Sequence, residues 1–341
     1  MKTLRRLAAF ALLLTLVVVV FGAYVRLSDA GLGCPDWPGC YGKATPAHAA
    51  EHILDAQAIR PDGPVSLPKA WKEMIHRYLA ASLGLLIVAI AVLCWRRRKE
   101  AGAGAGLALA LVGVVVFQGL LGKWTVTLLL KPAIVTGHLL GGLTTLALLA
   151  WLTFRLRDMR RVASAGGLVA MARIGLILLV LQIALGGWVS TNYAALACTD
   201  FPTCHGQWMP ADADFANAFH VVRELGMTAD GELLSNQALT AIHWTHRLGA
   251  LIVGAYLLLL ALLMLRHRHS APHGAALGAG VLLQVSLGIA NVLTSLPLPL
   301  AVAHNAVAAL LVLIMVLINY RLRRSTSPAW SAGREHESVY A

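Results

Sequence analysis

The five residues Glu73-Met74-Ile75-His76-Arg77 open an apolar stretch, Tyr78 to Trp95, that is long enough to cross a lipid bilayer. A second copy of the arrangement, His243-Trp244-Thr245-His246-Arg247, opens another such stretch much later in the chain. Single histidines, His138 and His304, stand near the starts of two further apolar stretches. These four histidines, in two pairs, are the central feature of the sequence.

The composition indicates an integral membrane protein. Of the 341 residues, 58% are hydrophobic and only 13% are charged, and the mean hydropathy is +0.70, outside the usual range of soluble domains. The formal net charge of +12 does not indicate a nucleic-acid partner, because lysines and arginines cluster in short segments between apolar stretches and there set membrane topology. We therefore expect the lipid bilayer, and no nucleic acid, as the surroundings of the chain.

Eight apolar stretches are long enough to span the membrane as helices. They cover residues 7–25, 74–95, 105–128, 133–154, 171–191, 240–265, 274–294 and 299–320. The basic clusters fall at alternate ends of these stretches, which predicts that both termini are cytoplasmic. The first stretch resembles a cleavable signal peptide, but it has a counterpart in mid-chain and is expected to remain as a helix. Since no transit peptide precedes it, we expect a multi-pass protein of the bacterial plasma (inner) membrane.

The chain repeats itself. The segment 22–25 resembles 186–189, and the loop motif C-x5-C at 34–40 lies over the one at 198–204, both at an offset of 164 residues. His138 pairs with His304 at an offset of 166, and His76 pairs with His246 at 170. Each copy holds four helices, an even number, so both copies enter the membrane in the same orientation. The predicted fold is all-α, with eight transmembrane helices forming two parallel-repeat four-helix bundles.

The repeat also predicts the domain limits. Residues 1–155 form the N-terminal bundle, residues 156–325 form the C-terminal bundle, and residues 326–341 form a cytoplasmic tail. Long outer loops join the first and second helices of each bundle. Within these loops, apolar spacing suggests short surface helices at 47–59 and 215–225.

The four histidines are predicted to ligate haem iron, in the pairs His76 with His138 and His246 with His304. An ionisable side chain inside a bilayer is costly and usually marks a function. Two imidazoles from different helices, at one depth in an apolar bundle, provide the axial ligands that a haem needs. Zinc is disfavoured because it requires a third and usually a fourth ligand nearby, and the first bundle offers only Glu73 as a further ligand. A proton relay or simple packing remains the alternative role.

Several neighbouring residues leave two interpretations open. Arg77 and Arg247 directly follow His76 and His246. Each can pair with a haem propionate, or its long side chain can simply extend to the membrane–water interface. The glycines beside His138 allow either a porphyrin or another helix to approach closely; they are Gly137, Gly141 and Gly142. The paired glutamines Gln118 and Gln284 can bond to a ligand or to a helix. Lys123 and Lys131 are either interface anchors or contacts for an anionic group.

The cysteines form two C-x5-C pairs and one single residue, Cys94. Both pairs fall on the predicted outer side, which is oxidising in bacteria, so we expect the disulfides Cys34–Cys40 and Cys198–Cys204. A redox or metal-binding role for the first pair is the alternative. Cys94 is expected to be an apolar filler.

The two halves differ beside the histidines. Glu73 precedes His76 by three residues, whereas His243 precedes His246 by the same spacing, and this spacing places each on the face of its neighbouring ligand. A carboxylate beside only one haem suggests that the first site performs proton-linked chemistry and the second carries electrons. Glu73 is therefore the predicted catalytic residue. The alternative is an interfacial charge paired with Lys72 or Arg77.

The combination of these motifs resembles the haem A synthase family over essentially the whole chain. The resemblance rests on E-x-x-H-R at Glu73–Arg77, H-x-x-H-R at His243–Arg247, the single histidines His138 and His304, and the outer C-x5-C pairs. It implies an oxidoreductase of cytochrome oxidase assembly that converts haem O to haem A by oxidising a porphyrin ring methyl group to a formyl group.

The resemblance also implies a division of labour. Haem b is held by His246 and His304, the substrate haem is taken by His76 and His138, and Glu73 is needed for activity. Two axial histidines leave the iron no open position, so either one ligand dissociates or the oxidation is indirect. Candidate partners are haem O synthase, cytochrome oxidase assembly factors and a second copy of the chain.

Two other functions remain as alternatives. A dihaem b-type electron-transfer subunit requires two equivalent, permanently bound haems, and the Glu73/His243 difference weighs against it. A transporter built from parallel repeats requires ionisable residues along a path through the membrane, whereas here they gather near one face.

Overall fold

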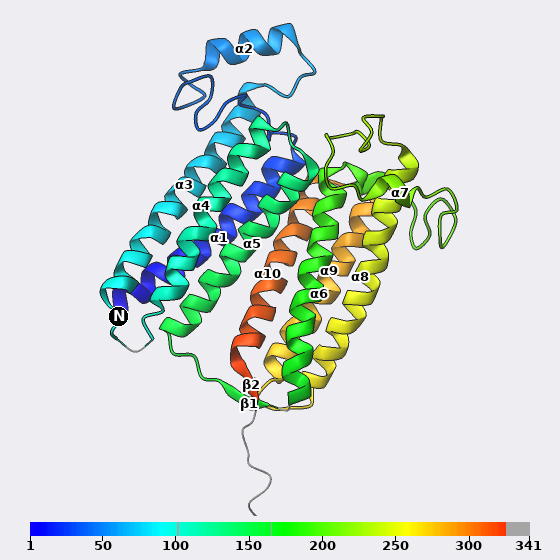
Figure 1. Cartoon of the computed structure of the whole chain (residues 1–341). Helices are drawn as coiled ribbons and strands as arrows, with labels where there is room; N and C mark the ends of the chain where they lie inside the picture. The colour runs from blue at the N-terminus through cyan, green and yellow to red at the C-terminus, as the bar shows by residue number, and fades with distance from the viewer. Residues whose placement is uncertain (101, 165, 325–341) are drawn as a thin grey trace, which may run out of the picture.

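A computed structural model of the chain describes residues 1–100, 102–164 and 166–324. Eight of its helices are long and apolar enough to span a membrane (Figure 1), so the predicted all-helical, multi-pass class is confirmed. They are α1 (Lys2–Leu27), α3 (Leu67–Arg96), α4 (Ala105–Thr127), α5 (Pro132–Leu156), α6 (Gly166–Thr191), α8 (Asn236–Leu265), α9 (Ala271–Leu293) and α10 (Leu298–Arg321). The predicted tail, 326–341, lies outside the described residues.

The helices α3 and α8 begin earlier than their apolar stretches. The predicted starts at 74 and 240 are wrong, because apolarity marks only the membrane-embedded part of each helix. Pro68 lies in the first turn of α3, where a missing N–H costs nothing. The side chain of Ser235 caps α8 by accepting a hydrogen bond from the amide of Ala238. His76 and His246 therefore lie well inside their helices, in the third and fourth turns.

The outer loops contain three short helices, α2 (Ala50–Ile59), η1 (Ala194–Leu196) and α7 (Phe215–Ala218). The expected helix at 47–59 is present as α2, but most of the one expected at 215–225 is not helical. There the chain wraps around the buried guanidinium of Arg223, which donates to the carbonyls of Asn217 and Met227 and to the side chain of Asn192. These contacts satisfy the loop carbonyls without a helix.

A pair of three-residue strands, which the sequence did not predict, lies at the end of the helices opposite these loops. β1 (Val162–Ser164) pairs in parallel with β2 (Leu322–Arg324) and so ties the α5–α6 connection to the end of α10. The N-terminus lies at the same end of the molecule (Figure 1).

The spanning helices contact one another in two closed sets of four. In the first set, α1, α3, α4 and α5 each touch two neighbours in that order around a ring; in the second, α6, α8, α9 and α10 do the same. Contacts of α1 and α5 with α10, and of α5 with α6, join the two sets. The duplication itself stays a prediction from the sequence.

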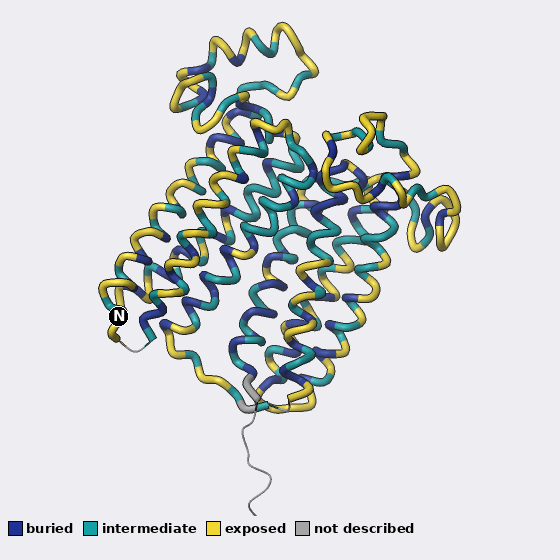
Figure 2. Tube along the Cα trace, viewed as in Figure 1, coloured by how far each residue is buried: buried dark blue, intermediate teal, exposed yellow. Residues whose placement is uncertain are grey.

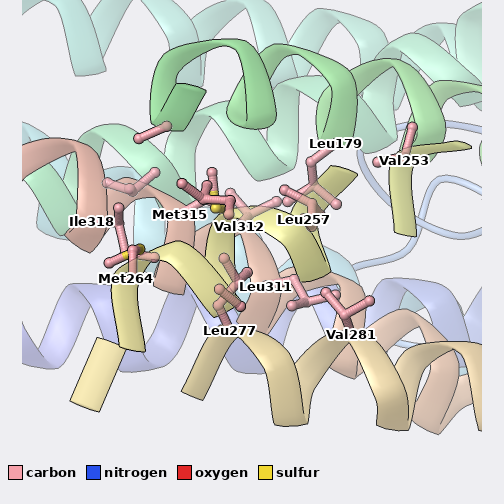
Figure 3. Packing of buried hydrophobic residues seen from close by; sticks show 14 of the residues in the cluster. Leu179, Val253, Leu257, Met264, Leu277, Val281, Leu311, Val312, Met315 and Ile318 are labelled. Atoms are coloured by element: carbon pink, nitrogen blue, oxygen red, sulfur yellow. The ribbon is translucent and has the colours of Figure 1, made fainter. Parts of the chain in front are cut away.

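Each set has a packed apolar core at the end away from the outer loops. In the second set the core includes Leu257, Leu311 and Met315, all almost fully buried (Figure 3). In the first set it includes Leu4, Ile87 and Leu149. Side chains toward the loops are mostly only partly buried, as the teal segments of α5 show (Figure 2). The two large core clusters therefore lie toward one end of the helices, and only smaller buried clusters lie under the loops.

Candidate functional site

The four predicted histidines come from diagonally opposite helices. In the first ring, α3 carries His76 and α5 carries His138, and these helices face each other across the ring rather than lying side by side. In the second ring, α8 carries His246 and α10 carries His304 in the same relation. A planar ligand inside either ring is therefore approached from both of its faces by an imidazole.

The histidines stand above the packed cores. On each of the four helices the large core cluster begins at least three residues deeper than the histidine, with Leu83, Leu143, Val253 and Val307 as its outermost members. Smaller clusters under the loops, built on the Cys34–Cys40 and Trp188 regions, lie on the other side. Between the two lies a layer in which all four imidazoles remain partly accessible.

Glycines of the remaining helices border this layer. A Cβ built at Gly22 of α1 would lie 2.8 Å from His76 Cε1, and one at Gly186 of α6 would lie 3.0 Å from His246 Cε1. Gly122 of α4 and Gly288 of α9 face His138 and His304 in the same way, at 3.4 and 3.2 Å. Each imidazole thus occupies space that a side chain on the neighbouring helix would take.

The sequence pointed to other glycines. Of the three glycines beside His138, Gly141 leaves room for the side-chain amide of Gln118, which a Cβ built there would overlap. A Cβ built at Gly142 would lie at ordinary contact distance from Val19, and one built at Gly137 would meet no atom within 4 Å. Two of the glycines that face the imidazoles, Gly22 and Gly186, open the repeated segments 22–25 and 186–189. Their contacts were missed because helical spacing gives depth in the membrane but not the lateral neighbour.

Polar atoms in the layer lack hydrogen-bond partners. The Nδ1 atoms of His76, His138 and His304 are buried without a partner among the described residues, as are Gln118 Nε2 and Gln284 Oε1. The other amide atom of Gln284, Nε2, lies 3.1 Å from His304 Nε2. Buried polar atoms are almost always paired, so the orphaned atoms fit a site that holds a ligand.

The donor set fits haem better than a small metal ion. Two imidazoles per ring, apolar walls and close glycines are suited to a porphyrin with axial histidines. The described residues contain no group of three or more His, Cys, Asp or Glu side chains that could hold a metal ion directly, and zinc sites need at least three protein ligands.

Glu73 anchors an outer loop. Its Oε2 accepts a hydrogen bond from the amide of Cys34 at 2.9 Å, and its Oε1 pairs with Arg77 at 2.6 Å. His243 occupies the equivalent position in the second half, where its Nδ1 accepts from the amide of Cys198 at 3.2 Å. Pairing with Arg77, the alternative weighed from the sequence, is therefore present, and the catalytic role of Glu73 stays a prediction.

The two arginines bind the disulfide loops. Arg77 Nη1 donates to the carbonyls of Asp36 and Gly39, at 2.8 and 2.5 Å. Arg247 donates to the carbonyls of Cys198, Asp200 and Thr203, at 2.7, 2.8 and 2.8 Å. Both guanidinium groups thus have partners within the protein, and their pairing with propionates stays a prediction.

Both C-x5-C pairs lie at disulfide-bonding distance, with 4.9 Å between the Cα atoms of each pair, and Cys94 is buried. Each loop turns on an aspartate: Asp36 accepts from the amides of Tyr41 and Gly42, and Asp200 from those of His205 and Gly206. The Thr203 hydroxyl and these amides hold the pKa of Asp200 well below its usual value.

Comparison with known proteins assigns the family. Residues 5–316 match the family model described as cytochrome oxidase assembly protein. A protein of Shewanella oneidensis named heme A synthase is 45% identical over 94% of this chain and 97% of its own. Its namesakes in Sphingopyxis alaskensis and Paracoccus denitrificans are 30% and 27% identical, covering 92% and 90% of this chain and 90% and 84% of theirs. The chain therefore belongs to the cytochrome oxidase assembly protein family, together with these heme A synthases.

Proposed function

We propose that the chain is a haem A synthase, a membrane oxidoreductase that converts the ring methyl group of haem O to the formyl group of haem A. The observation that carries the proposal is the layer of four histidines between packed core and outer loops, in a chain 45% identical to a relative named heme A synthase. The proposed domains are 1–155 for the substrate and 156–325 for a resident haem.

In this proposal His76 and His138 hold the substrate, haem O, in the N-terminal ring. His246 and His304 hold haem b, which supplies a one-electron relay when bound. The apolar cores below both layers exclude water from the deeper part of each site. Because Gly22 and Gly186 have no side chain, they leave space for the imidazoles of His76 and His246.

Glu73 is proposed as the residue that moves protons at the substrate. Methyl oxidation releases protons, and a carboxylate three residues from His76 lies on the same face of α3. The second half has no carboxylate at this position, because His243 provides the anchor for its loop. The proposal therefore separates two properties of Glu73: its hydrogen bond to Cys34 and its negative charge.

The test exchanges the two anchors. We expect Glu73→His to keep the hydrogen bond to Cys34, since His243 makes the same bond to Cys198, and to keep both haems but stop formyl production. The matched variant, His243→Glu, should still make haem A. Both are measured by extracting the haems from purified protein and identifying them by chromatography and mass. Haem A production by Glu73→His at the wild-type rate would refute the role of the carboxylate.

The same extraction tests the overall function. Wild-type protein produced with a source of haem O should yield haem B together with haem O, haem A or a hydroxylated intermediate. Two equivalents of haem B alone would instead support the dihaem electron-transfer subunit.

The chain is further proposed to place both termini in the cytoplasm. An even number of spans supports this, since the N-terminus and the end of α10 lie at one end of the molecule (Figure 1), and basic clusters gather there. Haem O synthase, oxidase assembly factors and a second copy of the chain remain proposed partners. Reporter fusions at each terminus test the orientation.

A further inference from the structure

Lys72 is a charged residue on the inward face of α3. It precedes His76 by four residues, a spacing that places both side chains on one face of the helix and sets Lys72 about 6 Å nearer the outer loops. Leu83, a member of the packed core, continues the same face seven residues beyond His76. The side chain of Lys72 is partly buried, so this lysine is directed toward the inside of the N-terminal ring.

The ammonium group of Lys72 lies beside aromatic rings that lead to the same imidazole. Its Nζ is 5.0 Å from the centre of the Tyr24 ring on α1, which is within the range of a cation–π contact. The centre of the Tyr24 ring lies 5.6 Å from that of Phe21, and the Phe21 ring lies 6.4 Å from the imidazole of His76. Lys72 therefore borders the outer side of the layer that contains His76.

Lys72 has no counter-ion among the described residues. Glu73, its neighbour in sequence, pairs with Arg77 instead, and the other ion pairs of the described chain do not include Lys72. A partly buried charge without a partner of opposite sign is costly. The surroundings of Lys72 thus suit a ligand that brings a negative charge.

The C-terminal half uses the equivalent positions differently. At the offset of 170 that relates α3 to α8, the counterpart of Lys72 is Ile242, which is buried. At the offset of 164 that relates α1 to α6, the counterpart of Tyr24 is Trp188. A cation also lies near the Trp188 ring, at 5.5 Å, but it belongs to Arg223, which donates to carbonyls of its own loop. A lysine without an ion-pair partner at this position is therefore a feature of the N-terminal half.

We infer that Lys72 binds a propionate carboxylate of the substrate porphyrin in the N-terminal ring. The inference rests on the proposed function, since it assumes that His76 holds haem O. The apolar core that begins at Leu83 disfavours carboxylates, so the propionates of a porphyrin held by His76 face the outer loops, where Lys72 lies. Arg77 already donates to the disulfide loop and to Glu73. The ammonium group of Lys72 is available for a charge-assisted hydrogen bond to a propionate.

The test measures the binding of haem O, and of its uncharged dimethyl ester, to the full chain with haem b bound, by absorbance titration in detergent. Wild-type protein should bind the ester about tenfold more weakly, because a hydrogen bond to a charged group contributes about that factor. Lys72→Ile, which reproduces Ile242, should bind haem O about tenfold more weakly and the ester as wild type does. Lys72→Arg should keep most of the affinity for haem O. The matched control is Lys123→Ile, which removes an exposed lysine of α4 and should bind both ligands as wild type does.

An equal loss of affinity for haem O and for the ester in Lys72→Ile would mean that the lysine serves only packing, and it would overturn the inference. Equal binding of the two ligands by wild-type protein would do the same without any variant. If Lys72→Ile does not retain haem b, Lys72→Gln replaces it and is judged in the same way. Failure of the proposed function is recognised separately, because haem O binding by wild-type protein would then be unchanged in His76→Ala.

Discussion

At the scale of single residues, Glu73 and His243 occupy equivalent positions in the repeat and make the same contact with the outer loop through different side chains. Glu73 and His243 each accept the amide hydrogen of the first cysteine in the adjoining loop, at 2.9 and 3.2 Å. The loop therefore does not require a carboxylate at this position. A residue whose contact with the loop can also be made by another residue type, and which differs between the halves, is a candidate for chemistry in only one of them.

The glycines that face the imidazoles lead to a prediction at the same scale. In Gly22→Ala the added Cβ would lie 2.8 Å from His76 Cε1, which is closer than real Cβ contacts, so the ring must move. We expect retention of the substrate haem to fall on the order of tenfold, as for other changes around metal-binding histidines, while haem b is kept. In Gly186→Ala, with 3.0 Å to His246 Cε1, haem b should be lost preferentially.

The control for both variants is Gly84→Ala in α3, because nothing lies within 4 Å of a Cβ built there. It should retain both haems and gain helix stability of up to about 1 kcal/mol. Haem extraction from the three purified variants measures the retention of each haem, and denaturant titration in mild detergent measures the stability of Gly84→Ala. Equal loss of both haems in Gly22→Ala and Gly186→Ala would argue that the glycines serve general packing instead.

The sequence predicted the identity of the site residues better than their surroundings. His76, His138, His246 and His304 stand out by type, because a histidine in an apolar stretch is rare, and by the repeat offset. Gln182, whose side-chain amide contacts His246, does not stand out, since its counterpart at the offset of 164, Val18, breaks the repeat and the contact joins residues 64 positions apart. Contacts between helices depend on the rotation and lateral position of each helix, which no spacing along the chain specifies.

At the scale of helices and loops, apolarity located the spans but not the helix ends. The start of α8 is fixed by a polar residue, Ser235, whose hydroxyl accepts from the Ala238 amide at 3.2 Å. At the start of α3, Ser66 makes no such side-chain hydrogen bond. These two serines, at equivalent helix starts, allow the effect of the cap to be measured.

We expect Ser235→Ala to destabilise the protein by about 1 kcal/mol, the usual contribution of an N-cap side chain. Ser66→Ala serves as the matched control and should change stability by much less, because its hydroxyl caps nothing. Denaturant titration in mild detergent, followed by far-ultraviolet circular dichroism, gives both values. A larger effect for Ser66→Ala than for Ser235→Ala would contradict the assigned caps.

At the scale of the whole molecule, the two sets of helices are joined, at the end that carries the long loops, by contacts between repeat counterparts. Arg26 Nη2 donates to the carbonyl of Ser190, its counterpart at an offset of 164, at 2.7 Å. The hydroxyl of Tyr193 donates to Asp29, related by the same offset, at 2.9 Å. The guanidinium of Arg26 also lies 4.2 Å from the centre of the Tyr193 ring.

A second link joins Lys131 to Glu224, which form an ion pair at 2.7 Å. The sequence left Lys131 as an interface anchor or a contact for an anionic ligand, and its observed partner is a loop carboxylate of the other half. Its side chain and that of Glu224 are 34% and 60% exposed, whereas that of Arg26 is only 15% exposed. The two links should therefore contribute differently to stability.

We expect Arg26→Ala to lower the free energy of unfolding by about 2 kcal/mol, because it removes a hydrogen bond from a charged donor and a cation–π contact. Lys131→Ala should lower it by less than about 1 kcal/mol, since exposed ion pairs contribute little. The same detergent titration compares them, at low and high salt. Salt should reduce the effect of Lys131→Ala further but leave most of that of Arg26→Ala, because the latter is shielded from solvent. If the two variants were equally stable, or if salt abolished the Arg26 effect, the Arg26 cluster would be no more than a surface contact and the halves would depend on their apolar helix faces alone.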